Sequence, residues 1–272
     1  MKKTIVIMLA MAVITGGIVS SCAFSKKAYK SASDAVSNVN VFPYTEDIKL
    51  GKQVKDEISS KPDEFPVLSR SQNREIYAYL EDLKKKIVNT GELRYAEDYP
   101  WVLTIIDDDK TLNAFATPGG YIYIYTGLIK FLESEDELIG VLGHEMAHAD
   151  RRHSTRQLTK SLGLSMLLDA VLGKQDAVEQ IVGSLVGLKF SRSHESEADE
   201  YSVKYLCKTS YNSDGAAGFF QKLKDQPTPP QFLSTHPNPE NRIEKMKELE
   251  QELNCSGTTT NKQKYEQIKK LL

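Results

Sequence analysis

The sequence shows no excess of basic residues. Its 272 residues include 35 Lys and Arg against 37 Asp and Glu, a formal net charge of −2, and the basic residues are scattered along the whole chain. Proteins that hold a nucleic-acid backbone carry a basic patch or stripe, because phosphate contacts need cations. The composition therefore argues against nucleic acid as a partner.

A membrane-spanning run is missing from the sequence beyond its N-terminal region. The apolar segment around Leu164 to Leu172 is much shorter than the roughly 20 residues that a spanning helix needs, and it contains Asp169. We expect this segment to be a core or lid helix. With 40% hydrophobic residues, the chain can bury one substantial core, so we expect one main domain with flanking helices.

The N-terminus has the features of a secretory signal. Lys2 and Lys3 precede an apolar run, which predicts a signal peptide over residues 1–21. The segment VSSC ends at Cys22 and resembles a bacterial lipobox, in which the cysteine is acylated. A plain secretory peptide is the alternative. We expect a lipid-anchored tether at 22–43, a folded domain at 44–255 and a tail at 256–272.

Cysteine is scarce, with three in the chain. Once Cys22 is lipidated, Cys207 and Cys255 remain as thiols in a compartment where disulfides can form. Both lie near the ends of predicted helices. The sequence therefore allows a Cys207–Cys255 bridge without requiring it.

The pattern of apolar residues predicts an α+β protein that is mainly helical. Short β-branched and aromatic runs predict a small mixed sheet. Ser134 and Glu137 have the spacing of a capping box, and the tail predicts a loosely held helix. The expected helices are 45–60, 71–88, 134–150, 194–208 and 240–253, and the expected strands are 101–106 and 121–125.

The segment GHEMAH contains an HExxH motif in the helix predicted at 134–150. His144 and His148 lie one turn apart, about 40° from each other around the axis, so both imidazoles can reach one metal ion. Glu145 reaches beside that metal, where it can take a proton from a zinc-bound water as general base. An ordinary amphipathic helix would also fit, but the helical context favours a site for one Zn²⁺ per chain.

A catalytic zinc needs a third protein ligand and an open fourth position. The metzincin motif is absent, because Arg151 and Ser154 stand where that motif has glycine and histidine. His153 lies about 180° around the axis from His144 if the helix continues. We therefore expect His153 to pack or to hydrogen-bond rather than to bind the metal.

The dense acidic cluster downstream, at 194–200, offers a third ligand. In a helix, Glu195 and Asp199 share the apolar face, whereas Glu197 and Glu200 point away. We expect Glu195 to bind zinc and Asp199 to orient a zinc-binding histidine by a hydrogen bond. A solvated acidic helix start is the alternative that spacing alone leaves open.

These motifs resemble the gluzincin zinc metallopeptidases of the HtpX, BepA and LoiP type, which are related to the CAAX prenyl endoproteases. The resemblance covers about residues 45 to 250. It rests on NAFATPGG at 113–120, HEMAH at 144–148, SR at 191–192 before ESEAD at 195–199, and HP at 236–237 followed by Arg242. It implies a zincin-like metallopeptidase domain, with the sheet beside the HExxH helix. It also implies that Glu195 is the third ligand and that Asp199 acts behind the ligands, in agreement with the helical-face argument.

Further roles follow from the same resemblance. His236 and Arg242 lie beside the zinc in similar enzymes, where they stabilise the oxyanion or, in resting forms, fill the open metal position. The alternative is that the segment with His236 and Arg242 is only a rigid turn that caps the following helix. The family binds peptides along an edge strand, which implies substrate binding at Tyr121, Ile122 and Tyr123 by backbone pairing. The alternating aromatic residues of that strand fit core packing equally well.

The resemblance implies a metalloendopeptidase in the bacterial cell envelope, anchored by lipid at the outer membrane on its periplasmic side. Its substrates would be misfolded or unassembled proteins. Prenyl-protein processing is disfavoured because the polytopic relatives have spans that this chain lacks, and no helical-repeat module follows the domain. A chaperone-like or latched lipoprotein with little proteolysis is the main rival, and an enzyme acting on a non-peptide amide is the other.

Overall fold

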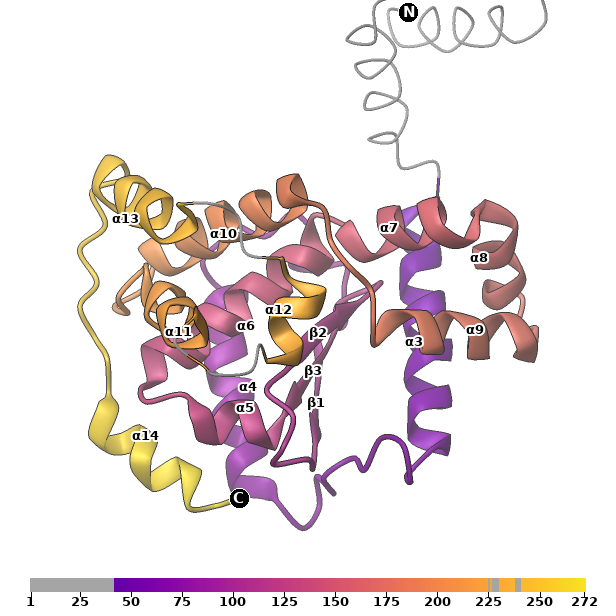
Figure 1. The fold of residues 1–272 in the computed structure, drawn as a ribbon, viewed down its shortest axis with the longest axis horizontal. Helices are drawn as coiled ribbons and strands as arrows, with labels where there is room; N and C mark the ends of the chain where they lie inside the picture. The colour runs from indigo at the N-terminus through magenta and orange to yellow at the C-terminus, as the bar shows by residue number, and fades with distance from the viewer. Residues whose placement is uncertain (1–41, 225, 227–229, 238–240) are drawn as a thin grey trace, which may run out of the picture. The chain divides into compact units, whose positions relative to one another are not determined.

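The computed structural model describes residues 42–224, 226, 230–237 and 241–272. The predicted signal peptide, the lipidation site Cys22 and the predicted tether up to residue 41 lie outside the described residues. The described part is mainly helical with one three-stranded mixed sheet (Figure 1), so the predicted fold class is confirmed. All the described residues belong to one compact unit. Within it, no helix has the length and apolar character to cross a membrane.

The helices match most of the predicted positions within three residues. The sequence patterns predicted five of them with bounds, and they also predicted a helix around 164–172 and one in the tail, where Leu164–Val171 and Lys262–Lys269 are helical. Their bounds are α3 Tyr44–Ser60, α4 Arg74–Val88, α5 Thr126–Phe131, α6 Glu135–Asp150, α7 His153–Leu162, α8 Leu164–Val171, α9 Gln175–Leu185, α10 Arg192–Cys207, α11 Gly215–Lys224, α12 Gln231–Thr235, α13 Arg242–Glu252 and α14 Lys262–Lys269.

The sheet contains one strand that the sequence patterns did not predict. Its strands are β1 Val102–Ile106, β2 Ala114–Thr117 and β3 Tyr121–Tyr125, in the order β1-β3-β2. β3 pairs parallel to β1 and antiparallel to β2. The β2–β3 turn contains Gly119 and Gly120, both at positive φ (77° and 82°), which glycine adopts at no steric cost.

The central position of β3 corrects the prediction that Tyr121, Ile122 and Tyr123 bind substrate as an edge strand. Their backbone groups pair with β1 on one side and β2 on the other, so no free edge remains for a peptide. The side chains fill the core. Tyr121 and Tyr123 pack into one apolar cluster with α3 and α9, and Ile122 packs into another with α4 and α6. β2 is the edge strand on that side of the sheet.

Helix α6 is buried along its whole length and contacts β2, β3, α10 and α11. Two glycines permit close helix packing. A Cβ added at Gly140 would lie 2.5 Å from the backbone nitrogen of Ala216 in α11, and one added at Gly143 would lie 3.0 Å from Oγ of Ser202 in α10. These contacts fix the spacing between α6 and the two helices beside it.

The start of α6 differs from the predicted capping box. The Ser134 side chain makes no capping hydrogen bond, and the Glu137 carboxylate instead accepts from the backbone N–H of Glu133 at 2.8 Å. Lys222 of α11 also donates to Glu137 at 2.6 Å. Glu137 therefore bonds to the N–H of Glu133 instead of that of Ser134, and it also binds Lys222 of another helix. The capping-box spacing predicts neither contact.

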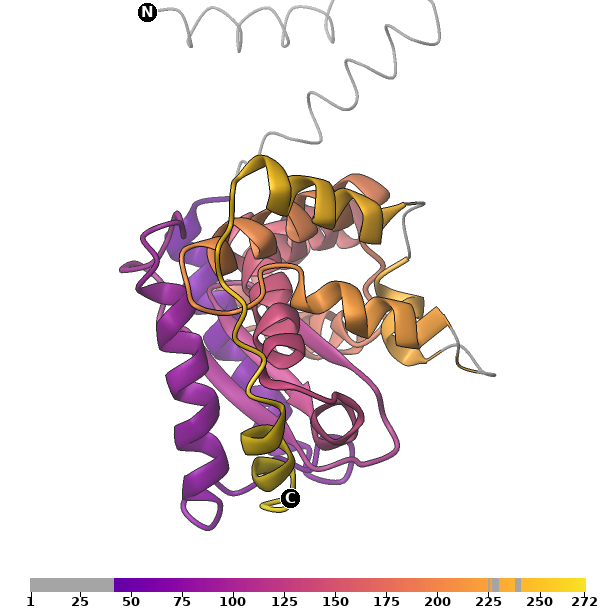
Figure 2. The same ribbon diagram turned by 90° about the vertical axis from the view of Figure 1, so that its left-hand side faces the viewer.

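The C-terminal tail is held firmly rather than loosely. Tyr265 of α14 is fully buried and donates to the backbone carbonyl of Ile129 at 2.6 Å. The buried carboxylate of Glu135 accepts from Asn261 at 2.6 Å and from Tyr79 at 2.7 Å. Figure 2 shows the segment after α13 running along the molecule to α14. An aromatic anchor and a buried carboxylate explain why the predicted loose tail is wrong.

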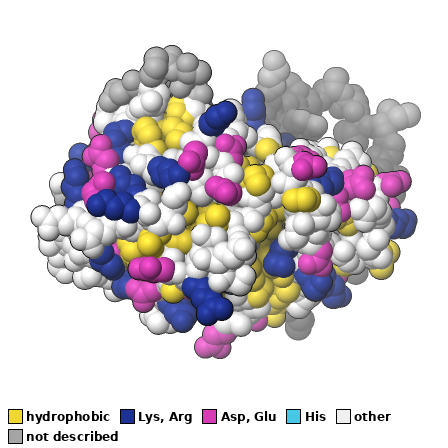
Figure 3. Space-filling view, turned by 90° about the horizontal axis from the view of Figure 1, so that it is seen from below, with side chains coloured by type: hydrophobic (Ala, Val, Ile, Leu, Met, Phe, Trp, Pro, Cys, Tyr) yellow, Lys and Arg dark blue, Asp and Glu magenta, His cyan; other side chains and the backbone are white. Residues whose placement is uncertain are grey.

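A disulfide joins Cys207, the last residue of α10, to Cys255, three residues after α13. Their Cα atoms lie 4.9 Å apart and are separated by 48 positions in the sequence. The bridge therefore ties the C-terminal ends of two helices that also contact each other along their length. Basic and acidic side chains are interspersed on the face seen in Figure 3, as the near-zero net charge indicates.

Candidate active site

The two histidines of the HExxH motif meet on one face of α6. Their Nε2 atoms lie 3.1 Å apart, and both side chains are completely buried. Phe190 stacks on His148 with ring centroids 4.0 Å apart. The single-turn spacing thus produces the convergence that the sequence predicted.

Helix α10 brings a carboxylate to these histidines. Ser191 caps α10 by accepting from the N–H of His194 at 3.2 Å. Glu195 then lies with Oε1 3.4 Å from Nε2 of His148 and Oε2 3.5 Å from Nε2 of His144. Oδ1 of Asp199 lies 3.0 Å from Nδ1 of His144. The structure therefore places both acids on the inward face, as predicted.

His236 follows α12 and enters the same cluster. Its Nδ1 lies 3.1 Å from Oε1 of Glu195 and 3.4 Å from Nε2 of His144, and its Nε2 lies 3.5 Å from Oε1 of Glu145. Phe232 stacks on the ring with centroids 4.2 Å apart. His236 thus faces both the ligand atoms and the general-base candidate.

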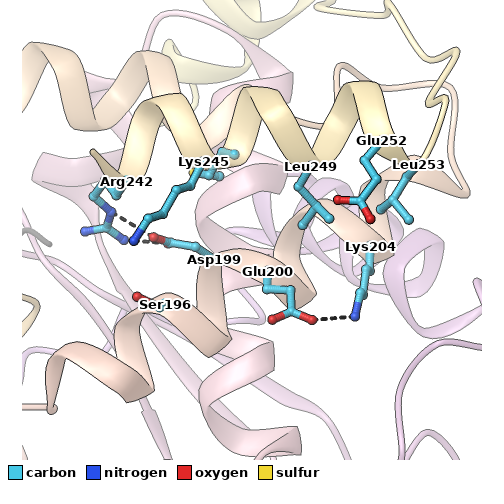
Figure 4. A pocket seen from close by; sticks show the side chains of 10 residues that line it. Ser196, Asp199, Glu200, Lys204, Arg242, Lys245, Leu249, Glu252 and Leu253 are labelled. Carbon is cyan, nitrogen blue, oxygen red and sulfur yellow. Dashed lines mark hydrogen bonds and ion pairs between the residues drawn. The ribbon is translucent and has the colours of Figure 1, made fainter. Parts of the chain in front are cut away.

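Arg242 lies behind the cluster rather than across from Glu145. Its Nε and Nη2 donate to the two oxygens of Asp199 at 3.0 and 2.6 Å, as Figure 4 shows for these facing side chains. The guanidinium also lies 3.5 Å from the centroid of Phe220. Nη2 of Arg242 also lies 3.7 Å from Oε2 of Glu195. These contacts place Arg242 beside the two acids of α10 and give no support to the predicted oxyanion role across from Glu145.

The donor atoms fit a tetrahedral metal ion. Two ligands about 2.1 Å from a zinc ion at tetrahedral angles lie about 3.4 Å from each other. The contacts between His144, His148, Glu195 and His236 span 3.1–3.5 Å, and one donor atom of each lies within 4.8 Å of all the others. Oε2 of Glu195 is buried and accepts no hydrogen bond. A cation between these groups would satisfy it.

The two candidate histidine ligands differ in their electrostatics, because burial holds the pKa of His148 well below its usual range. Burial opposes protonation of His144, but its hydrogen bonds to Asp199 and Glu195 prevail and raise its pKa to about 9. Burial would raise the pKa of Glu195, yet His236 and the other two histidines hold that pKa well below its usual range. Burial raises the pKa of Glu145, as suits a group that accepts and returns a proton.

His153 hydrogen-bonds behind His148, as predicted, and its partner Glu197 was not assigned a role from the sequence. Nδ1 of His153 lies 3.0 Å from Nδ1 of His148, and Nε2 of His153 lies 3.0 Å from Oε2 of Glu197. Burial lowers the pKa of His153 to about 4. Glu197 lies off the buried face of α10 that carries Glu195 and Asp199, as predicted, but its side chain is only 30% exposed and accepts from Arg151 at 2.9 Å. Charged residues of both signs near an HExxH helix are the only signal that the sequence offers.

The free edge of β2 passes beside the candidate general base. The N–H of Tyr125 donates to the carbonyl of Asn113, so Ala114 and Ala116 direct their backbone groups away from β3. Oγ of Ser154 donates to the outward carbonyl of Ala116 at 2.7 Å. The N–H of Ala116 faces the Glu145 carboxylate and moderates its raised pKa.

An HExxH helix beside a small sheet, with a glutamate supplied by a second helix, defines a metal-dependent peptidase of the zincin class. The chain belongs to peptidase family M48, whose family model matches residues 71–250. The metallopeptidase class predicted from the motifs is thereby confirmed.

Proteins named as proteases are similar to this chain. The beta-barrel assembly-enhancing protease of Escherichia coli (strain K12) is 30% identical over 162 residues, which cover 53% of this chain and 33% of that protein. The protein of the same name from Yersinia pestis is 29% identical over 184 residues, 61% and 37% of the two chains. Mitochondrial metalloendopeptidase OMA1 of Schizosaccharomyces pombe is 28% identical over 178 residues, 62% and 52%. The matched part of this chain thus spans about a third to a half of these relatives.

Proposed function

We propose that this chain is a zinc-dependent endopeptidase of the bacterial cell envelope that hydrolyses misfolded or unassembled proteins. The observation that carries the proposal is the position of Glu195, which completes a donor set with His144 and His148 at the spacing of a tetrahedral zinc site. The names of the bacterial relatives support a role in outer-membrane protein assembly or quality control.

The chain's own residues divide the chemistry between them. Zinc, when bound, supplies a Lewis acid that polarises the scissile carbonyl and acidifies a water. Glu145 takes the proton from the attacking water and returns it to the leaving amine, a task suited to its raised pKa. Asp199 accepts from Nδ1 of His144 and so directs Nε2 to the metal. Arg242 holds Asp199 in that position.

We assign substrate binding to the edge of β2 instead of to β3. An extended peptide that pairs with the outward backbone groups of Ala114 and Ala116 would run past Glu145. Both outward groups of Ala116 have partners in the present structure: its carbonyl accepts from Ser154 at 2.7 Å, and its N–H faces Glu145. Substrate would therefore compete with these internal contacts.

A latched state is the second candidate, and the burial of the site favours it. His144, Glu145, His148, Glu195 and His236 are all completely buried. His236 places Nδ1 where the fourth donor of the metal site would stand. Of its two predicted roles, filling the open metal position fits this arrangement better than oxyanion stabilisation. Displacement of His236 would then be a condition for hydrolysis.

The location and the domain division complete the proposal. Acylation of Cys22 would hold the protein at the periplasmic side of the outer membrane, after removal of residues 1–21. We propose the tether at 22–43 and the catalytic domain at 44–255, and we add the predicted tail at 256–272 to that domain. The buried contacts of Tyr265 make that tail part of the folded unit.

Cleavage of casein by the full chain tests the function. We expect hydrolysis that a chelator abolishes, that zinc restores and that Glu145→Gln eliminates, because the general base is lost. Glu200→Gln is the matched control, since Glu200 is exposed on α10 and pairs with Lys204 away from the site. A zinc-loaded wild type that leaves casein intact, together with a cleaving His236→Ala variant, would identify the latched state. Unchanged cleavage by Glu145→Gln would sink the proposal.

A further inference from the structure

The two candidate metal-binding histidines are supported in different ways. His144 meets a carboxylate, with its Nδ1 3.0 Å from Oδ1 of Asp199. His148 meets another imidazole, with its Nδ1 3.0 Å from Nδ1 of His153. A carboxylate only accepts, so the first contact fixes the proton of His144 by itself. An imidazole nitrogen can donate or accept, so the second contact needs a further group to set its direction.

Glu197 is that further group. Its Oε2 lies 3.0 Å from Nε2 of His153, and its Oε1 accepts from Nε of Arg151 at 2.9 Å. The carboxylate accepts a hydrogen bond from His153, so the proton of that neutral ring stands on Nε2. Nδ1 of His153 then has only a lone pair to offer. His148 must donate from its own Nδ1, which leaves the lone pair on its Nε2.

That lone pair points into the candidate metal site. Nε2 of His148 lies 3.1 Å from Nε2 of His144 and 3.4 Å from Oε1 of Glu195. Only the tautomer with the proton on Nδ1 can offer Nε2 to a cation there. The direction of two hydrogen bonds behind the site therefore decides whether one of its ligand atoms is available.

The backbone builds this arrangement with a sharp turn. Helix α6 ends at Asp150, and Arg152 adopts a left-handed conformation with φ 58°. The turn returns His153 to the side of His148, whereas a continuing helix would carry it to the opposite side. His153 is completely buried, and His194 stacks on it with ring centroids 4.5 Å apart. The ring is therefore held in one orientation.

We propose that Glu197 and His153 form a positioning pair that fixes the tautomer of His148 and so keeps its Nε2 available for the metal. The pair acts through His148 and touches neither metal nor substrate. The inference rests on the proposed metal-binding role of His148. It assigns to Glu197 and His153 a function that burial and packing alone would not require.

Glu197→Gln reverses the direction of the hydrogen bonds with little change in shape. Arg151 donates to Oε1 at 2.9 Å and holds the amide oxygen on its side more closely than Arg156, which lies 3.5 Å from Oε2, so the amide NH₂ turns to Nε2 of His153. His153 then donates from Nδ1, and His148 carries its proton on Nε2. His153→Asn keeps a carbonyl acceptor near the place of Nδ1 and serves as the conservative variant. Glu200→Gln makes the same charge change on the exposed face of α10.

Two measurements on the full chain test the pair. Nitrogen NMR of histidine-labelled, metal-free protein reads the tautomer of His148, and competition with a chelator gives the dissociation constant for Zn²⁺. We expect the tautomer to switch and zinc affinity to fall about 10- to 100-fold in Glu197→Gln, with His153→Asn and Glu200→Gln close to wild type. Thermal unfolding of the metal-free variants identifies any that fail to fold, and His153→Phe then replaces Glu197→Gln as the variant without an acceptor.

The outcomes separate this inference from the proposed function. An unchanged His148 tautomer with unchanged zinc affinity in Glu197→Gln would overturn the positioning pair, even if the wild type is a peptidase. If the wild type binds zinc and Glu197→Gln shows the expected switch, but neither the wild type nor His236→Ala cleaves casein, the pair stands and the proposed activity is refuted.

Discussion

The disulfide between Cys207 and Cys255 should contribute a large part of the stability of the domain. It closes a loop between residues 48 positions apart. In the chain-entropy description, cross-linking a loop of that length removes unfolded-state entropy worth about 4 kcal/mol at 25 °C. For a domain of this size, 1 kcal/mol corresponds to about 2 to 4 °C in melting temperature. Replacing both cysteines by serine should therefore lower the melting temperature by about 8 to 16 °C.

Thermal unfolding followed by circular dichroism, with and without a reducing agent, measures this effect. The wild type should shift downward on reduction, and the double serine variant should not respond, which makes it its own control. A shift below about 3 °C on reduction, with the bond shown to be intact beforehand, would refute the loop-entropy reasoning. It would mean that the contacts between α10 and α13 already restrict the unfolded chain.

Other expectations concern groups around the site. Arg242→Ala should cost about 3 to 5 kcal/mol of unfolding free energy, because it leaves Asp199 buried without its cation, and chemical denaturation of the metal-free protein measures the loss. Hydrogen bonds from Tyr211 and Asn261 outweigh burial and lower the pKa of Glu135. These hydrogen bonds therefore stabilise the folded state above about pH 4.5, and this contribution is lost as the pH falls through the lowered pKa of Glu135 in the folded protein. Denaturation at pH 7 and at pH 4 should accordingly show a smaller pH dependence for Glu135→Gln than for the wild type. Ala114→Pro should lower kcat/KM for an extended peptide about three- to tenfold while zinc affinity stays constant, because it removes one outward N–H of β2. An equal loss for a substrate too short to reach that position would contradict strand pairing.

The local part of the site could be predicted from the sequence because helix periodicity determines it. His144 and His148 are one turn apart in any helix, and the same rule places Glu195 and Asp199 on one face of α10. Helical spacing cannot say which helix faces which. The resemblance to a known family was needed for His236, which comes from a loop 92 positions from His144.

The remaining features depend on backbone geometry that periodicity does not encode. The position of His153 depended on whether the helix continued past Asp150. The chain instead turns at Arg152, which brings His153 beside His148, where it hydrogen-bonds as predicted. The short strand β2 lacks the β-branched run that marked β3, so the sheet was given the wrong edge. Glu137 was assigned to a local cap although it binds Lys222 of another helix. Each error arose where a tertiary contact or a single left-handed residue overrides a local pattern.

The close packing at Gly143 determines the distance between α6 and α10 in this metalloprotease. A Cβ at position 143 would lie 3.0 Å from Oγ of Ser202, so the glycine lets α10, which carries Glu195, approach the two histidines closely. Alanine at position 143 would push α10 away from α6, and serine would push it further, while the ligand residues themselves stay unchanged. We expect a change in the separation of α6 and α10 to alter the distances between Glu195 and the two histidines, and with them the cations that fit the site.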